Sequence, residues 1–598
     1  MTTMRTNNGM FRQLVLVGLA TLLAAASARA AEPYAIRIVD PPLSNQAIRP
    51  DAPLPKICRT GNRLELMAAR GEYEPASFMV DASKPLQQVH VVASDLRGPG
   101  GVIPAAAIDL RVVAPVFRYT SDFPIVMNWV LVHDPNLIEV RDEPQPRSQQ
   151  PDAPPVSLAY TKTNYFTREP IDADVLQPAD IAKQQQFWLT IHVPTDARPG
   201  LYHGQLTITA KNQTNQSLDV QLTVPKFDLA NPEFEYSVYH PAWLVGDLPV
   251  DNQQGYAVLT ADEYLVDLQN MAAHGCRNPV IYPQANAKAD GTLDFSQLEI
   301  VLKAREQTGM SKDRLFLLGA GQVNSSQKLG EGQYALNVRQ VKELVEYLNQ
   351  RGYGDVHLMG ADEATGEALM AQRDAWQSIH EGGARIFVAH YAGYTDGIGD
   401  LLNVPIMLHP MHALMDRHSL MPAAKFLAMP PEVREGLEVD LLFKPDVQDK
   451  IKRVHQAGHR VFTYMDPCAG HVWVEHHRRM RGLGLWKAQL DGTMTWAYTH
   501  INQPRYREAG PFNVSIGFVL RGKNASFDTL SWEAYREGYD DARYLATLKN
   551  ALVQAKDQQS KAKLVKSTQQ WMDQVGMNIN LKDWRSEMAR RAEELLAK

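Results

Sequence analysis

The chain has 598 residues, of which 44% are hydrophobic and 21% charged, and its formal net charge is −6 at pH 7. This composition is that of a folded protein and not of a disordered one, and the length predicts two or three domains. Because no basic face, zinc-finger spacing or arginine-rich run occurs, nucleic acid is not an expected partner.

Residues 1–30 differ from the rest of the chain. Arg5 and Arg12 precede the apolar run LVLVGLATLLAAA, and small residues follow at Ala28 and Ala30. This order is typical of a secretory signal peptide cleaved after Ala30, with an uncleaved anchor as the alternative. No later stretch is long and apolar enough to cross a bilayer. We therefore expect an exported protein, periplasmic or extracellular, without a transmembrane segment after signal cleavage.

Residues 31–231 predict a β-sandwich domain. Short apolar runs separated by turn residues occur in RLELMAARGEYEPASFMVDAS, in QFWLTIHVPTDARPGLYHGQLTITA and in LDVQLTVPKFDL. Several short strands at this spacing are typical of two packed antiparallel sheets. The segment RDEPQPRSQQPDAPPVS is rich in proline, which cannot pair within a central strand, so it predicts a long loop.

Residues 232–555 alternate short apolar runs with helix-length amphipathic stretches. Eight strand candidates occur: EYSVYH, NPVIYPQ, RLFLLGAGQ, DVHLMGADE, RIFVAHY, VPIMLHP, RVFTYMDP and GTMTWAYTH. This alternation predicts a (β/α)8 barrel; a doubly wound open sheet is the alternative, but no glycine-rich nucleotide fingerprint follows any strand. Residues 556–598 predict a helical tail. The expected fold class is multidomain β plus α/β, with an N-terminal sandwich, a barrel and a C-terminal helical tail.

Two adjacent carboxylates, Asp362 and Glu363, follow the fourth strand candidate in HLMGADEATGEAL. Like charges this close push one carboxyl toward holding its proton, which is useful in acid/base chemistry. A regular strand would point only one of the two side chains inward, but Gly360 and the end of the strand loosen that rule. The alternative is a solvated loop dipeptide without a role.

The other strand ends carry aromatic and polar residues. In chain order the candidates for substrate binding are His390, Tyr391, Tyr464, Asp466, Trp496 and Tyr498. Active sites of such barrels gather at the carboxyl ends of the strands. Aromatic faces cover the apolar C–H surfaces of sugar rings, while carboxylates bind hydroxyls and move protons, so a carbohydrate substrate is expected. Aromatic side chains that only cap the barrel core are the alternative.

Several stretches resemble glycoside hydrolase family 123, whose members pair an N-terminal β-sandwich with a catalytic barrel. They are LMAARGEYEPASF near residue 66, VPTDARPGLYHGQLTI near 193, GADEATGE at the fourth strand, and RGLGLWKAQLDGTMTWAY with WEAYREGYDDARYLATL near the C-terminus. Together they span most of the chain after residue 30. The family resembles the β-N-acetylhexosaminidases, so the resemblance implies hydrolysis of β-linked N-acetylhexosamine, with N-acetylgalactosamine favoured.

The resemblance also implies roles for the acidic pair. Glu363 would protonate the glycosidic oxygen and later activate water, while Asp362 would hold the N–H of the 2-acetamido group. The acetamido oxygen would itself attack the anomeric carbon, a substrate-assisted route to retained configuration. Tyr391 or Tyr464 would donate a hydrogen bond to that group, and either Trp486 or Trp496 would wall its pocket. Ala364 stands where the family commonly has proline. The resemblance therefore implies the identity of the sugar less firmly than it implies the roles of the two carboxyl groups in proton transfer.

Two other functions remain open at this stage. A two-carboxylate retaining glycosidase would use Glu363 as acid and Asp466 as nucleophile, on a sugar without an acetamido group. A non-catalytic carbohydrate-binding envelope protein is the alternative from another class.

No metal or other cofactor is expected. His471, Glu475 and His476 in HVWVEHH do not match the zinc-protease spacings. The three cysteines, Cys58, Cys276 and Cys468, suit neither a zinc site nor a disulfide framework. We expect buried free thiols, with a pair between Cys276 and Cys468 as the alternative.

Overall fold

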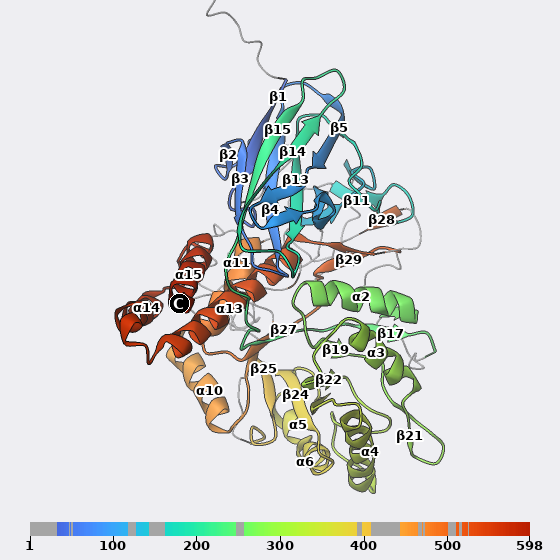
Figure 1. The fold of residues 1–598 in the computed structure, drawn as a ribbon. Coiled ribbons are helices and arrows are strands. Elements are labelled where there is room, and N and C mark those ends of the chain that lie inside the picture. The colour runs from blue at the N-terminus through green and yellow to red at the C-terminus, as the bar shows by residue number, and fades with distance from the viewer. Residues whose placement is uncertain are drawn as a thin grey trace, which may run out of the picture.

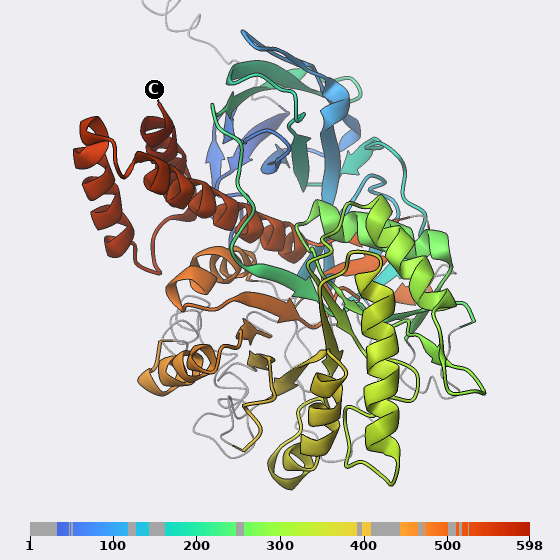
Figure 2. The same ribbon diagram turned by 60° about the horizontal axis from the view of Figure 1, so that its bottom comes forward.

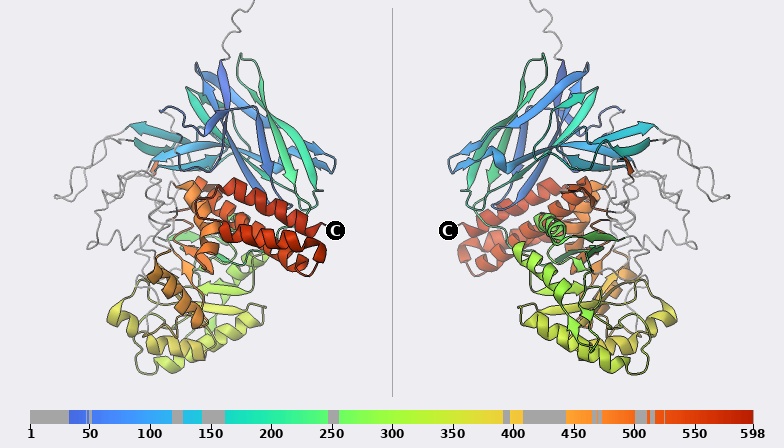
Figure 3. Two further views of the ribbon diagram at one scale, coloured as in Figure 1. Left: turned by 90° about the vertical axis from the view of Figure 1, so that its left-hand side faces the viewer. Right: turned by 90° about the vertical axis from the view of Figure 1, so that its right-hand side faces the viewer.

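The computed structural model describes residues 33–46, 48, 52–117, 127–142, 162–246, 256–390, 397–407, 443–464, 469, 473–499, 510–512, 517–523 and 525–597. A β-sandwich lies at one end, a barrel of strands and helices lies at the other, and the C-terminal helices lie between them at one side (Figures 1 and 3). The predicted multidomain β plus α/β fold is confirmed. The predicted signal peptide and nearly all of the predicted proline-rich loop lie outside the described residues. Among the described helices, none is long and apolar enough to cross a membrane.

The sandwich consists of two sheets. The first has the order β2 (Cys58–Thr60), β1 (Tyr34–Val39), β4 (Tyr73–Ala82), β13 (Gln184–His192), β8 (Ile108–Phe117) and β9 (Met127–Val132). The second has the order β12 (Ala179–Ile181), β5 (Leu86–Ala93), β14 (Gly200–Thr209), β15 (Gln216–Val224) and β3 (Arg63–Met67), with β6 (Leu96–Gly98) and β7 (Gly101–Ile103) beside β14. The runs β3 and β4, consecutive in sequence, therefore lie in different sheets, as do β13 and β14.

Alternation of apolar residues builds the core of the sandwich. In β15 every second residue from Leu218 to Val224 is buried, because successive side chains of a strand point to opposite faces. In the other sheet Phe78 of β4 pairs with Phe187 of β13, and their rings stack with centroids 5.2 Å apart. These side chains belong to one buried cluster shared by both sheets.

Eight parallel strands form the barrel. In chain order they are β16 (Glu235–Val238), β19 (Val280–Ile281), β22 (Arg314–Leu317), β23 (Asp355–Met359), β24 (Arg385–His390), β25 (Val404–Met407), β26 (Phe462–Thr463) and β27 (Gly492–Thr495). The strand β16 pairs with β27, and a parallel bridge between Tyr239 and Val280 joins the end of β16 to β19. The sheet is thus closed, as a barrel requires.

Helices cover the outside of the barrel strands (Figure 2). They are α2 (Ala261–Ala273), α3 (Ser296–Gln307), α4 (Gln333–Asn349), α5 (Gly366–Met370), α6 (Arg373–Glu381), α10 (Pro445–Gln456), α11 (Val474–Arg479) and α12 (Leu485–Lys487), with a π-helical turn at Met480–Gly484 between the last two. The apolar faces of these helices pack on the strands in one large buried cluster, except that Val474 of α11 packs with Trp188 of β13 and Leu530.

Smaller elements complete the described chain. They are the 3₁₀ turns Ala105–Ala107 and Gln559–Lys561, the sheet of β10 (Ile138–Asp142), β11 (Lys162–Phe166) and β28 (Gly510–Phe512), and the pairs β17 (Ala242–Leu244) with β18 (Ala257–Leu259), β20 (Asn286–Ala287) with β21 (Leu293–Asp294) and β29 (Val519–Arg521) with β30 (Ser526–Asp528). The sheet of β10, β11 and β28 joins the sandwich half of the chain to the segment after the last barrel strand.

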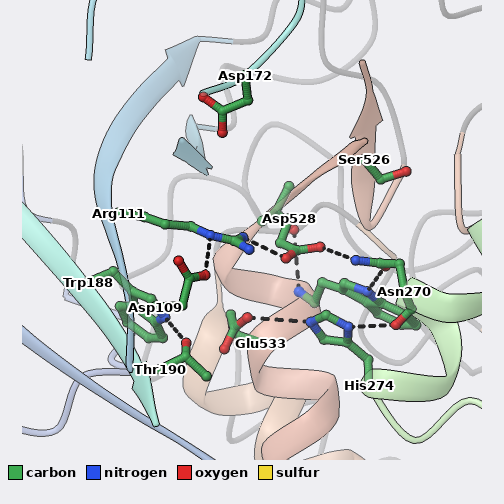
Figure 4. A network of polar contacts seen from close by, with 12 residues as sticks. Asp109, Arg111, Asp172, Trp188, Thr190, Asn270, His274, Ser526, Asp528 and Glu533 are labelled. Carbon is green, nitrogen blue, oxygen red and sulfur yellow. Dashed lines mark hydrogen bonds and ion pairs between the residues drawn. The ribbon is translucent and has the colours of Figure 1, made fainter. Parts of the chain in front are cut away.

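A polar network joins the sandwich, the barrel and the long helix α13 (Leu530–Ala555), as Figure 4 shows. Arg111 of β8 lies 2.7 Å from Asp528, and Asp528 accepts a hydrogen bond of 2.7 Å from Asn270 of α2. His274, directly after α2, has its Nε2 atom 3.4 Å from a carboxylate oxygen of Glu533 in α13. All three parts of the molecule therefore contribute to one junction.

A second buried network involves Arg585 of helix α15 (Leu581–Leu596), which packs with α14 (Ala562–Gln574) and α13. Its guanidinium lies 2.6 Å from Asp541, 2.9 Å from Glu537, 3.2 Å from Glu74 and 3.4 Å from Glu72. Burial raises the pKa of Glu72 to about 8 and that of Glu74 well above its usual range, although the charge of Arg585 opposes both shifts. Arg585 thus offsets the cost of several buried carboxylates where β4 meets the C-terminal helices.

Replacing Arg585 by methionine should lower the free energy of unfolding by about 3–5 kcal/mol. It removes the cation that contacts all four carboxylates of this network and leaves Arg478 beside Asp541 and Glu537. Arg590, on the same helix, pairs with Glu587 and Glu594 at the surface, so Arg590→Met is the matched control and should cost less than about 1 kcal/mol. Urea denaturation of both variants measures the difference. Equal losses would contradict the role given to Arg585.

Candidate active site

A cavity of about 570 Å³ opens at the carboxyl ends of the barrel strands. Its walls come from the ends of β19, β22, β23, β26 and β27 and from the segment before α2. The lining residues are Tyr256, Tyr282, Leu318, Ser325, Ser326, Met359, Gly360, Ala361, Asp362, Tyr464 and Trp496. Its volume and its mixture of aromatic and polar walls are typical of small-molecule sites.

The loop that carries the two carboxylates continues from β23 along the edge of β24. The Gly360 amide donates to the Phe387 carbonyl, and the Glu363 amide donates to the Ala389 carbonyl, both at 3.0 Å. Glycine is required at 360, because a Cβ atom there would lie 2.9 Å from Cζ2 of Trp376. Strand β23 ends at Met359, and Glu363 has a φ of 54°, in the left-handed region, so the alternation of a regular strand does not apply to this loop. Asp362 lines the cavity, and Glu363 follows it directly in the chain.

The pKa of Asp362 in this loop is shifted from its ordinary value. Partial removal of water by the cavity walls and the neighbouring charge of Glu363 raise the pKa of Asp362 to about 6. Its side chain still reaches the open mouth, where it is exposed. Burial, and then the charges of Tyr464, Asp362, Tyr282 and Glu363, raise the pKa of Tyr239 well above its usual range. The charges of both carboxylates therefore act on the same buried hydroxyl.

Aromatic rings form most of the remaining wall. The ring of Tyr239 lies 5.9 Å from that of Tyr464 and 5.4 Å from that of Trp496, measured between centroids. Tyr282, directly after the neighbouring strand β19, lies edge-on to Tyr256 at 5.5 Å. Burial, together with the charge of Asp362, raises the pKa of Tyr256 and of Tyr282, so both hydroxyls keep their protons at neutral pH. The wall thus combines apolar faces with hydrogen-bond donors.

The structure brings together Asp362, Tyr464 and Trp496 among the predicted site residues. Tyr391 and Asp466 lie outside the described residues. His390 ends strand β24, but its side chain is also outside the described part of the chain.

Two predicted site residues lie elsewhere. Trp486 is in α12 on the outside of the barrel, where its ring stacks on Trp584 of α15 at 6.1 Å. Tyr498 is fully buried, and its hydroxyl donates to Asn270 and Ser526 at 3.1 and 3.0 Å. The predictions that these two residues contact substrate are corrected, because the packing of the C-terminal helices and of α2 engages both side chains.

Sequence reasoning missed Tyr256, Ser325 and Ser326 among the lining residues. The two serines follow the third barrel strand by several residues. A pair of serines in a loop is the only pattern in the sequence that could have indicated their place in the cavity wall. Ser325 donates from Oγ to the Met359 carbonyl at 2.5 Å, which ties this loop to the end of β23.

Among the described residues, His274, Asp528 and Glu533 place possible metal-ligand atoms within 4.8 Å of one another. Their atoms already have partners: Asp528 binds Arg111 and Asn270, and Nδ1 of His274 lies 2.8 Å from the Asn270 carbonyl. This group therefore acts as the domain junction described above. In the HVWVEHH segment, His471 lies outside the described residues, while Glu475 pairs with Arg479 at 2.5 Å.

Comparison with solved structures found a similar fold in a family 123 glycoside hydrolase from Clostridium perfringens, an enzyme of glycolipid glycan hydrolysis. The match has a TM-score of 0.53 and 12% identity, and covers 90% of this chain and 94% of that chain. The predicted resemblance to family 123 is thus confirmed at the level of the fold. No family model and no curated protein matches the chain.

Two further solved structures matched with lower TM-scores. One is a GH5 xyloglucanase from Bacteroides ovatus in complex with a XXXG heptasaccharide, with a TM-score of 0.29 and 9% identity over 80% of this chain and 98% of that chain. The other is a family 39 glycoside hydrolase from Bacteroides cellulosilyticus WH2, with a TM-score of 0.29 and 12% identity over 80% of this chain and 81% of that chain.

The raised pKa of Asp362 predicts a pH-dependent stability difference. Between the ordinary aspartate pKa of about 4 and the folded value of about 6, the folded state retains a proton that the unfolded state releases. As the pH rises from about 4 to about 6, the free energy of unfolding of the wild type should therefore fall relative to that of Asp362→Asn. Thermal melts of both proteins from pH 4 to 7 measure this. In Glu363→Gln the fall should end at lower pH, because the neighbouring charge is gone; parallel curves for wild type and Asp362→Asn would contradict the assignment.

Proposed function

We propose that the protein is a glycoside hydrolase that cleaves β-linked N-acetylhexosamine from glycans, with N-acetylgalactosamine favoured. The observation that carries this proposal is the position of Asp362 in the wall of an aromatic cavity after β23, with the charge of its neighbour Glu363 acting on it. The fold shared with a family 123 glycoside hydrolase supports it, because such barrels hold their active sites at this face.

The proposed mechanism divides the work between the two carboxyl groups. Glu363 protonates the leaving oxygen as the glycosidic bond breaks, and then removes a proton from the attacking water. The substrate's acetamido oxygen forms the bond to the anomeric carbon, which gives an oxazolinium intermediate and, after hydrolysis, retained configuration. Since this nucleophile is already part of the substrate, its attack is intramolecular and fast.

Asp362 would accept the acetamido N–H and stabilise the positive charge that develops on that group. With a pKa of about 6, its carboxyl is ionised in most molecules at neutral pH, as this role requires. A carboxylate beside the developing cation favours the transition state more than the neutral ground state.

The aromatic walls support a sugar ring as ligand. Trp496, Tyr464, Tyr256 and Tyr282 all line the cavity. Apolar C–H faces of a pyranose pack on such rings, while hydroxyls and carboxylates bind its polar edge. The proposal needs no metal or other cofactor, and the order of residues 1–30 supports an exported enzyme.

Assays with p-nitrophenyl β-glycosides test the proposal. Wild type should cleave the N-acetyl-β-galactosaminide or glucosaminide and should leave the matching β-galactoside or β-glucoside essentially uncleaved. Glu363→Gln and Asp362→Asn should each lose roughly 10²–10⁴-fold in kcat. Small nucleophiles such as azide should partly restore Glu363→Gln when the leaving group is good.

Glu367→Gln is the matched control, since Glu367 is an exposed carboxylate of α5 in the next turn of the chain; it should retain wild-type kinetics. Full activity in both Asp362→Asn and Glu363→Gln would refute the site assignment. Cleavage of the glycoside without the acetamido group at a comparable rate would refute the substrate-assisted mechanism and favour two protein carboxylates.

A further inference from the structure

The loop that carries the proposed catalytic pair has one backbone contact that differs from the others. Gly360 and Glu363 donate their amides to backbone carbonyls of β24, whereas Ala361 donates its amide to a side chain, Oε1 of Gln372, at 2.8 Å. Ala361 immediately precedes Asp362. The path of the chain into Asp362 therefore depends on where this glutamine oxygen is held.

Gln372 is itself held firmly. It is fully buried between α5 and α6, and its Nε2 donates to the Ala368 carbonyl at 3.2 Å. A Cβ atom on Gly360 would lie 3.4 Å from its Oε1 atom, so the loop passes directly over the amide group. The side chain thus acts as acceptor toward the loop and donor toward α5 at the same time, and among side chains of its length only an amide does both.

The next turn of α6 extends this support to the cavity wall. Trp376 packs under Gly360, and its Nε1 donates to the Ser325 carbonyl at 2.9 Å. Ser325 in turn donates from Oγ to the carbonyl of Met359 at 2.5 Å. A continuous chain of contacts therefore runs from α6 through Ser325, which lines the cavity, back to the start of the acidic loop.

We infer that Gln372 is a positioning residue, which sets the place of the Asp362 carboxylate relative to the substrate without touching substrate itself. This inference rests on the proposed function. Misplacing a catalytic group by a fraction of an ångström lowers the rate of the chemical step more than it lowers binding. Gln372 should accordingly affect kcat more than KM.

Two substitutions test the two sides of this role. Gln372→Met keeps the length of the side chain but removes the hydrogen bonds, and should lower kcat by roughly 10- to 100-fold with less than about a threefold change in KM. Gln372→Glu keeps an acceptor for Ala361 and, because burial favours the protonated form of a carboxyl, can also keep a donor for Ala368. It should retain more of kcat than Gln372→Met, and the acidic limb of its kcat/KM profile should stay at the wild-type pH.

The groups whose charges act together with Asp362 are Glu363 and the hydroxyls of Tyr239, Tyr256 and Tyr282. The tyrosine hydroxyls have raised pKa values and stay neutral through the acidic limb, so a shift of this limb reports the carboxyl pair.

Gln340 of α4 is the matched control. It is equally buried and also uses both ends of its amide, accepting from the Gln322 amide and donating to the Gly291 carbonyl at 3.0 Å each. Gln340→Met should lower the melting temperature while leaving kcat per folded molecule and the pH profile as in wild type.

The outcomes separate the inference from the function on which it rests. If Asp362→Asn and Glu363→Gln are inactive but Gln372→Met has wild-type kcat and pH profile, the positioning role is wrong and the proposed function stands. If Gln372→Met does not fold, Gln372→Asn decides: its shorter amide cannot hold Ala361, so wild-type kcat in this variant overturns the inference. If Asp362→Asn and Glu363→Gln both remain fully active, the proposed function fails first.

Discussion

Closure of the eight-stranded sheet is the constraint on which the candidate site depends. The bridge between Tyr239 and Val280 joins the first barrel strand to the second, and β27 pairs with β16 on the other side. Because all strands are parallel, their carboxyl ends open at one rim. Tyr282 and Trp496, which lie far apart in the sequence, therefore line one cavity. In an open sheet of the same strands these two residues would lie at opposite edges.

At that rim, the loop that carries Asp362 and Glu363 has two features that each cost free energy. Burial, and then the charge of the adjacent Glu363, raise the pKa of Asp362, so the ionised carboxylate is costly in this place. Glu363 also adopts a left-handed backbone conformation, which is uncommon for a residue with a side chain. Such features persist where the surrounding contacts determine the conformation. Here the carbonyls of β24 and the side chain of Gln372 supply those contacts.

Ion pairs join the sandwich, which comes before the barrel in the chain, to the C-terminal helices, which come after it. Arg111 of the sandwich meets Asp528 beside α13, and Arg585 of the last helix reaches Glu74 of the sandwich. Buried charges of this kind contribute little net stability when paired and cost much when one partner is lost. They therefore favour one arrangement of the three parts over others. The position of Trp486 against Trp584 follows from this arrangement.

Features that depend on neighbours along the chain could be predicted from local patterns. These features are the alternation along β15, the repeated change between strand and helix in the barrel, and the place of Asp362 and Glu363 after the fourth strand, and they made the multidomain β plus α/β fold predictable. Local patterns could not show that β3 and β4 lie in different sheets, or that Tyr256 and Ser325 line the cavity while Tyr498 is buried against Asn270 and Ser526. Those outcomes depend on contacts between segments distant in sequence. An aromatic residue after a strand has the same local pattern whether it faces a ligand or another helix.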